Sequence, residues 1–259
     1  MVLNRFLSVL IIILFLCIQN CDWFDEVKVP DTPLWVKKSL PVDSIENGID
    51  AEPLENSIFM HWHPVQNKNL EGYKIYRSEI KDPLDDSIKE EFKVITKINI
   101  YHNPEYDTVF VDEDVKLNYF YRYIIRSFNY DGVLSEPSDT IEYSLIPKAS
   151  LVSPREGMVN PVRPEFKWRN GTRVNQLVLR LESFPSRKII WLCKFQNNNY
   201  TNEITTLRYN NVRNYPATLN SLVPGQQYRW RIDLIAFTNG WGADVEGSES
   251  LWQYFTVSE

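Results

Sequence analysis

Cysteine is scarce in this chain of 259 residues, which contains only three. Cys17 and Cys21 lie near the N-terminus, so Cys193 is the only thiol available to the rest of the chain. No disulfide framework is expected, and the hydrophobic cores must hold the fold alone. Cys193 lies in a strand-like run and is predicted to be a small buried hydrophobic residue rather than a nucleophile.

Histidine is equally scarce, with three residues, and the short motifs of common enzyme classes are missing. There is no Gly-x-Ser-x-Gly elbow, no Walker loop and no His-Glu-x-x-His motif. His61 and His63 flank Trp62 on a predicted strand and point to the opposite face, where with His102 they could share a divalent metal. Because a third ligand is not evident, solvent-facing histidines are the default interpretation. We therefore predict no enzyme activity and no cofactor, with His61 and His63 as the candidate metal pair.

An excess of basic residues is also missing. Lysine and arginine number 28 against 34 acidic residues, which gives a net charge of −6. Nucleic-acid binding requires basic stripes that displace counterions, so we expect no nucleic-acid partner. Apolar residues make up 43% and charged residues 24% of the chain, a composition typical of globular domains, and the length suffices for two.

The apolar run Phe6–Ile18 has only thirteen residues, too few for a comfortable membrane span. It follows Arg5 and has the length of the hydrophobic region of a signal peptide. The run leads into Gln19-Asn20-Cys21, which resembles a bacterial lipobox, although Asn20 stands where a small residue is usual. The resemblance implies that residues 1–20 are a lipoprotein signal peptide and that Cys21 carries the lipid. An uncleaved anchor or a plain secretory signal are the alternatives.

Residues 21–50 are predicted to be a tether. Asp22, Asp25 and Glu26 follow the cysteine, and prolines punctuate the remainder. Proline and charge favour an extended, unpacked chain, so a solvated linker is expected here. Acidic residues directly after a lipidated cysteine also resemble the surface-export signals of some lipoproteins.

The rest of the chain contains two copies of one unit. Trp62 precedes Tyr121 by 59 residues, and Trp168 precedes Tyr228 by 60. Each tryptophan ends a short alternating strand, and each tyrosine begins a longer one. Alternation puts Tyr228, Trp230, Ile232 and Leu234 on one face of their strand.

Several motifs follow one another in order along the two copies. In the first copy these are Trp62, Gly72-Tyr73-Lys74-Ile75-Tyr76-Arg77, Tyr121 and Asn129-Tyr130-Asp131-Gly132; in the second, Leu222-Val223-Pro224-Gly225 before Tyr228. Together these motifs resemble a fibronectin type III domain. The resemblance implies that each tyrosine is a corner tyrosine whose hydroxyl ties a crossing loop to its strand. We predict an all-β chain of two tandem Ig-like or fibronectin type III β-sandwiches, at 51–147 and 148–259, placed end to end by a short linker.

Aromatic side chains of the second unit are the candidate ligand-binding residues. Trp241 lies between glycines in the loop that joins the last two strands, while Trp252 and Tyr254 are predicted to face outward. Strand alternation also turns three arginines outward, namely Arg180, Arg229 and Arg231. Such tryptophans and arginines can stack as cation–π pairs, either as a structural ladder or as a flat surface for glycan rings.

The sequence as a whole indicates a non-catalytic lipoprotein of the cell envelope. Its lipid at Cys21 would hold it to a membrane, the outer membrane on its periplasmic or surface side. The first hypothesis is a protein-interaction or scaffold module with an envelope protein as partner, since sandwich edges can accept further strands. The alternative is a carbohydrate-binding accessory surface lipoprotein that uses Trp241, Trp252 and Tyr254.

Overall fold

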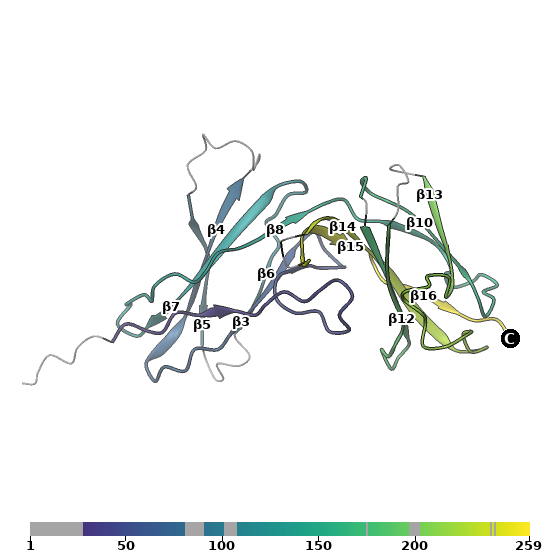
Figure 1. Cartoon of the computed structure of the whole chain (residues 1–259). Helices are drawn as coiled ribbons and strands as arrows, with labels where there is room; N and C mark the ends of the chain where they lie inside the picture. Colours follow the sequence, from purple (N-terminus) through teal and green to yellow (C-terminus); the bar gives the residue numbers. More distant parts are fainter. Residues whose placement is uncertain are drawn as a thin grey trace, which may run out of the picture.

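The computed structural model describes residues 28–80, 91–100, 108–174, 176–196, 203–238, 240 and 242–259. Two β-sandwiches follow one another along the molecule, and the purple N-terminal segment reaches the region between them (Figure 1). Domain 1 contains β1 (Leu34–Trp35), β2 (Asp50–Ala51), β3 (Ile58–His63), β4 (Leu70–Ile80), β5 (Lys93–Asn99), β6 (Val109–Asp112), β7 (Phe120–Asn129) and β8 (Ile141–Leu145). Domain 2 contains β9 (Ser150–Ser153), β10 (Glu165–Arg169), β11 (Gln176–Ser183), β12 (Ile189–Gln196), β13 (Ile204–Arg208), β14 (Gln227–Thr238), β15 (Asp244–Glu249) and β16 (Gln253–Thr256). In the described part of the chain, no helix is long and apolar enough to span a membrane.

The two domains repeat one strand order. In domain 1, β3 pairs with β1, β2 and β6, opposite a sheet in the order β8-β7-β4-β5. In domain 2, β10 pairs with β9 and β13. In the opposite sheet β14 pairs with β11, β15 and β16, and β12 pairs with the other edge of β11. The all-β class and the tandem sandwiches predicted from the sequence are therefore confirmed.

The corner tyrosines also behave as predicted. The Tyr121 hydroxyl accepts a hydrogen bond from the Lys116 amide at 2.8 Å, and the Tyr228 hydroxyl accepts one from the Val223 amide at 3.0 Å. Each bond ties the loop before the strand to the strand itself, because the tyrosine lies five residues after its donor.

Each sandwich has its own hydrophobic core. Trp62 and Trp168 lie fully buried, one in each core. Cys193 on β12 is buried in the core of domain 2, where burial raises the pKa of its thiol to about 12. The thiol therefore stays protonated and packs as a small hydrophobic group, as predicted.

The domains share one continuous sheet. β15 of domain 2 pairs in parallel with β8 of domain 1, Glu246 opposite Ser144 and Gly247 opposite Leu145. A side chain at Gly247 would not fit, because a Cβ there would lie 2.7 Å from the Leu234 carbonyl oxygen. The short linker predicts that the domains lie end to end, and the backbone pairing of β8 with β15 joins them there. We name this contact between the domains the joint.

The prediction that the tether is unpacked is wrong for its described part, residues 28–50. β1 and β2 both pair with β3, so this segment adds strands to domain 1. The Trp35 ring packs edge-to-face on Trp62 with centroids 6.0 Å apart, and its indole N–H donates to the Asp139 carbonyl at 2.9 Å. The apolar residues interspersed among the prolines and charges drive this packing, because their burial outweighs the preference of the chain for solvent.

Candidate functional site

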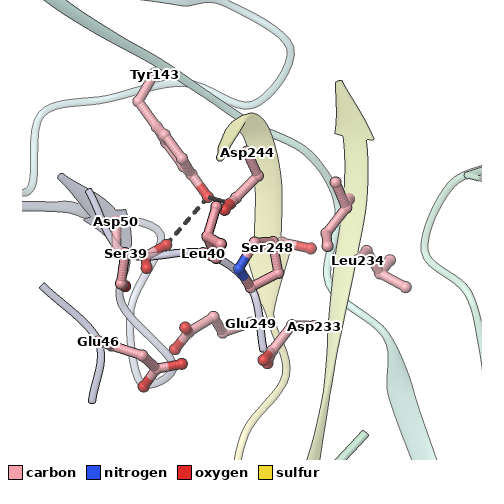
Figure 2. A pocket seen from close by; sticks show the side chains of 12 residues that line it. Ser39, Leu40, Glu46, Asp50, Tyr143, Asp233, Leu234, Asp244, Ser248 and Glu249 are labelled. Atoms are coloured by element: carbon pink, nitrogen blue, oxygen red, sulfur yellow. Dashed lines mark hydrogen bonds between the residues drawn. The ribbon is translucent and has the colours of Figure 1, made fainter. Parts of the chain in front are cut away.

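Residues 36–50, which we name the clamp segment, run from β1 to β2 across the joint between the domains. Lys38 is the first residue to bridge them, with its ammonium nitrogen 2.7 Å from Asp50 Oδ2 and 3.4 Å from Asp244 Oδ1 of domain 2. Tyr143 of β8 donates its hydroxyl proton toward the same two carboxylates, at 2.9 Å to Asp244 and 3.2 Å to Asp50 (Figure 2). The clamp segment, β8 of domain 1 and Asp244 of domain 2 therefore meet in one polar cluster.

Two arginines of domain 2 hold the middle of the clamp segment. Arg180 on β11 donates to the carbonyls of Asp43 and Ser44 at 3.1 and 3.4 Å, and its guanidinium lies 2.9 Å from Glu46. Arg231 on β14 also donates to Glu46. Both arginines are only 2% exposed, because the clamp segment covers them.

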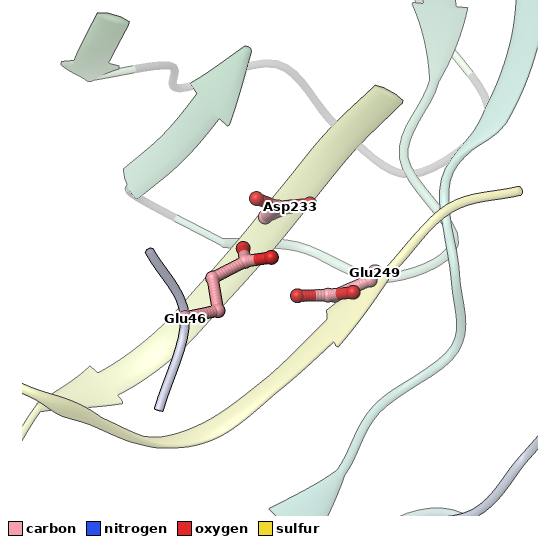
Figure 3. A group of neighbouring side chains, drawn as sticks. All are labelled: Glu46, Asp233 and Glu249. Carbon is pink, nitrogen blue, oxygen red and sulfur yellow. The ribbon is translucent and has the colours of Figure 1, made fainter. Parts of the chain in front are cut away.

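Arg231 is the centre of a wider ion-pair network. Its guanidinium donates to Glu249 Oε1 at 2.6 Å, and its Nε lies 2.8 Å from Asp233 Oδ1. With Glu46, these carboxylates bring three acidic side chains within 4.8 Å of one another (Figure 3). Such a trio can in principle ligate a cation. Here each of the three carboxylates already pairs with Arg231, and Glu46 also pairs with Arg180. Because guanidinium groups occupy the place a cation would take, the residues do not fit a metal site.

Burial perturbs the titration of this network. Desolvation raises the pKa of Asp233 to about 6 despite the neighbouring Arg231, and it raises the pKa of Glu249 well above its usual range. Desolvation raises the pKa of Asp244 as well. For Lys38, burial lowers the pKa, but the carboxylates of Asp50 and Asp244 outweigh it and leave the pKa raised. The cavity between these groups measures about 20 Å³, enough for one water molecule and too small for a substrate.

A much larger groove opens beside the joint, with a volume of about 1330 Å³. It runs between β1 and the first half of β8, ahead of the residues through which β8 pairs with β15. Its apolar lining comes from Leu34, Trp35, Val36, Leu40, Ile49, Ile141, Ala243 and Val245. Its charged lining includes Lys37, Asp43, Arg122, Asp139 and Glu142. The mixture of apolar and charged groups resembles that of a protein–protein contact.

The arginines and aromatics predicted to face outward are packed. Arg229 and Arg231 lie on the outer face of the sheet, as alternation requires, but Arg229 pairs with Glu182 at 2.6 Å and Arg231 is covered by the clamp segment. Their guanidinium carbons lie 4.0 and 4.9 Å from the centroid of the Trp252 ring, so the expected cation–π ladder is present. Trp252 itself is half-buried.

Tyr254 is also half-buried and packs edge-to-face on Phe184, with ring centroids 5.1 Å apart. Because both rings already have partners, these side chains do not form a bare, flat aromatic surface for a sugar. The remaining aromatic candidate, Trp241, lies outside the described residues, as does Cys21, the predicted site of lipid attachment.

The candidate metal pair remains two histidines on one strand face. His61 is half-buried and His63 is exposed, and burial together with the charge of His63 lowers the pKa of His61. Within the described residues, neither belongs to a group of three possible metal ligands. The possible third ligand, His102, lies outside them.

Sequence reasoning missed the residues that build the joint, above all Lys38, Glu46 and Asp50. They lie in a stretch whose prolines and charges predict a linker, and their partners Arg231 and Asp244 follow about 200 residues later. The one local signal was the pair of arginines on a polar strand face, since buried guanidinium groups need carboxylate partners.

No family model matches the chain, and no curated protein matches it. Among solved structures, it is similar to a two-domain fibronectin type III segment of chicken tenascin, at 16% identity over 87% of this chain and 99% of that one, with a TM-score of 0.29. The central fibronectin III array of RIM-binding protein shares 15% identity over 89% and 69%, with a TM-score of 0.27. The FN1–FN3 domains of chicken CNTN1 share 15% over 90% and 68%, with a TM-score of 0.29. At these scores the likeness carries no functional argument, and the fold assignment rests on the strand order and corner tyrosines above.

Proposed function

We propose that this chain is a lipid-anchored scaffold protein of the bacterial cell envelope, which holds a protein partner in the groove between β1 and β8 and carries out no catalysis. Cys21 would carry the lipid, and the protein would lie at the outer membrane, on its periplasmic or surface side. The groove is the observation that carries the proposal. At about 1330 Å³ it exceeds the usual range of small-molecule pockets and suits a segment of polypeptide.

The architecture around the groove supports this role. One wall belongs to β1 and the clamp segment and the other to β8, while Ala243 and Val245 of domain 2 also line the groove. The parallel pairing of β8 with β15 and the buried ion pairs of the clamp segment hold these walls in register. A preformed surface of this kind lowers the ordering cost of binding.

The alternative of carbohydrate binding gains no support from the described residues. Stacking on a sugar ring needs an accessible aromatic face, and Trp252 and Tyr254 are already packed against Arg229 and Phe184. The protein-interaction function is therefore preferred.

The substitution Leu34→Glu tests whether the groove binds the protein partner. Leu34 lines it and is 63% exposed, so a glutamate there should leave the fold intact but place a charge in the contact. We expect a crosslinking pull-down from native envelopes to recover one stoichiometric protein with the wild-type chain and at least about tenfold less with this variant.

The matched control is Leu54→Glu, which changes a leucine that is 76% exposed and lies outside the groove. It should recover the partner as the wild type does, whereas Cys21→Ser should lose it through loss of the anchor. Equal recovery with Leu34→Glu and Leu54→Glu would refute the groove as the binding site. Recovery of a glycan and no protein would favour the carbohydrate alternative.

A further inference from the structure

The chain enters the described structure at the end of domain 1 that lies opposite the joint. There the Asn129 side chain donates to the Lys28 carbonyl at 3.2 Å, and the Ser127 hydroxyl donates to the Asp31 carbonyl at 2.6 Å. Asn67 accepts from the Asp31 amide at 2.8 Å and donates to its carboxylate at 3.0 Å. Since Ser127 and Asn129 are buried, these bonds fix where the N-terminal segment leaves the domain.

The length of β7 sets the distance between this entry point and domain 2. Phe120, at the start of β7, pairs with Ser144, which also pairs with β15 at the joint. Asn129 ends the strand, and nine steps at about 3.3 Å each place it about 30 Å from the joint. Domain 2 lies beyond the joint, held by the shared sheet and the clamp segment (Figure 1).

The chain between the proposed lipid and this entry point is short. Seven peptide steps separate Cys21 from Lys28, and a fully extended chain covers at most about 3.5 Å per step, or about 25 Å in all. An anchor at Cys21 therefore keeps this end of domain 1 within about 25 Å of the lipid surface, whatever path those residues take.

The exposed side chains at this end suit a lipid interface. Val29 is 58% and Tyr130 69% exposed, and a tyrosine ring with its apolar body and polar tip is favoured among lipid head groups. The exposed charges nearby balance one another, with Lys28 and Lys68 against two aspartates, Asp31 and Asp131. Contact here would therefore rest on the apolar groups more than on net charge.

We propose that the end of domain 1 formed by Lys28, Val29, Lys68 and Tyr130, which we name the membrane-facing end, contacts the lipid surface. Domain 2 then forms the end of the molecule remote from the membrane. This inference rests on the proposed lipid anchor at Cys21, but it goes beyond that anchor because it fixes which domain meets the membrane and by which residues.

Quenching by lipid tests the orientation. The full lipidated chain is reconstituted in phosphatidylcholine vesicles that carry a head-group quencher, with a fluorophore on Asp131→Cys or on Val159→Cys. Asp131 lies beside Tyr130. Val159 is exposed at the far end of domain 2. Its neighbour Asn160 accepts a hydrogen bond at its backbone carbonyl from the Ser258 amide, near the C-terminus. Cys193 is buried, so the label attaches to the introduced thiol. We expect the label at 131 to be quenched several-fold more strongly than the label at 159.

Adding Tyr130→Ser to the Asp131→Cys chain distinguishes contact between the membrane-facing end and the lipid from mere proximity of the two. It should reduce quenching of the label at 131, because the ring that holds this end in the interface is gone. Unchanged quenching would overturn the contact, and equal quenching at 131 and 159 would overturn the orientation.

Flotation of the same vesicles distinguishes failure of the orientation from failure of the anchor. The wild-type chain should float with lipid and Cys21→Ser should not. If the wild type floats and the label at 159 is quenched as strongly as that at 131, the orientation is wrong while the proposed anchor stands. If the wild type does not float, the anchor is wrong and the orientation falls with it.

Discussion

Arg231→Met should destabilise the joint strongly at neutral pH. Methionine keeps an apolar stem of similar reach but removes the guanidinium that lies among Glu46, Asp233 and Glu249. Three carboxylates then remain within 4.8 Å of one another, with Arg180 paired to Glu46 alone. The variant therefore leaves the largely buried carboxylates of Asp233 and Glu249 incompletely compensated.

The expected cost follows from this geometry. Two like charges 4.8 Å apart repel by roughly 3.5 kcal/mol at an effective dielectric constant of about 20. Removal of one partner from a buried ion pair typically costs about 3–5 kcal/mol, which is of the same size as this repulsion. We expect Arg231→Met to lower the free energy of unfolding by about 3–5 kcal/mol at pH 7.

The loss of unfolding free energy caused by Arg231→Met should be smaller at lower pH. Burial already raises the pKa of Asp233 to about 6 and that of Glu249 well above its usual range, and removal of Arg231 raises both further. A carboxyl whose pKa is higher in the folded than in the unfolded state binds protons preferentially when folded, so stability is gained as pH falls through the folded-state pKa. Between pH 7 and pH 5 the variant should therefore recover part of its deficit relative to the wild type.

Urea unfolding followed by tryptophan fluorescence at pH 7 and pH 5 measures both effects. Arg122→Met is the matched control, since Arg122 makes a solvent-exposed pair with Glu142 at 3.4 Å. It should cost no more than about 1 kcal/mol and change little between the two pH values. The reasoning fails if Arg231→Met costs no more than Arg122→Met, or if its deficit is the same at both pH values.

Two further sets of variants test the fold and the aromatic ladder. Tyr121→Phe and Tyr228→Phe should each lower the free energy of unfolding by about 1–3 kcal/mol, because the amides of Lys116 and Val223 lose their acceptor; denaturant midpoints equal to that of the wild type would argue against the corner role. Trp252→Ala should lower the melting temperature by loss of two cation–π contacts, each worth about 0.5–1 kcal/mol, while retention on polysaccharide stays unchanged. Loss of glycan retention at unchanged melting temperature would instead support a sugar-binding role.

The sequence by itself determined the two sandwiches. Alternation on β3 and β14 selected the buried faces that hold Trp62 and Trp230, and the spacing of Trp168 and Tyr228 repeated that of the first copy. These features are local, since strand period and turn chemistry depend on neighbouring residues. Local alternation also placed Arg231 on the correct face of its strand.

Only the tertiary structure decided what covers that face. Glu46 and Arg231 are 185 positions apart, and no periodicity connects such positions. A stretch rich in proline and charge predicts a solvated linker, yet Trp35 packs on Trp62, and the clamp segment then reaches the arginines of domain 2. The groove and the joint follow from that long-range packing, because both are built from segments that meet only once the domains have formed.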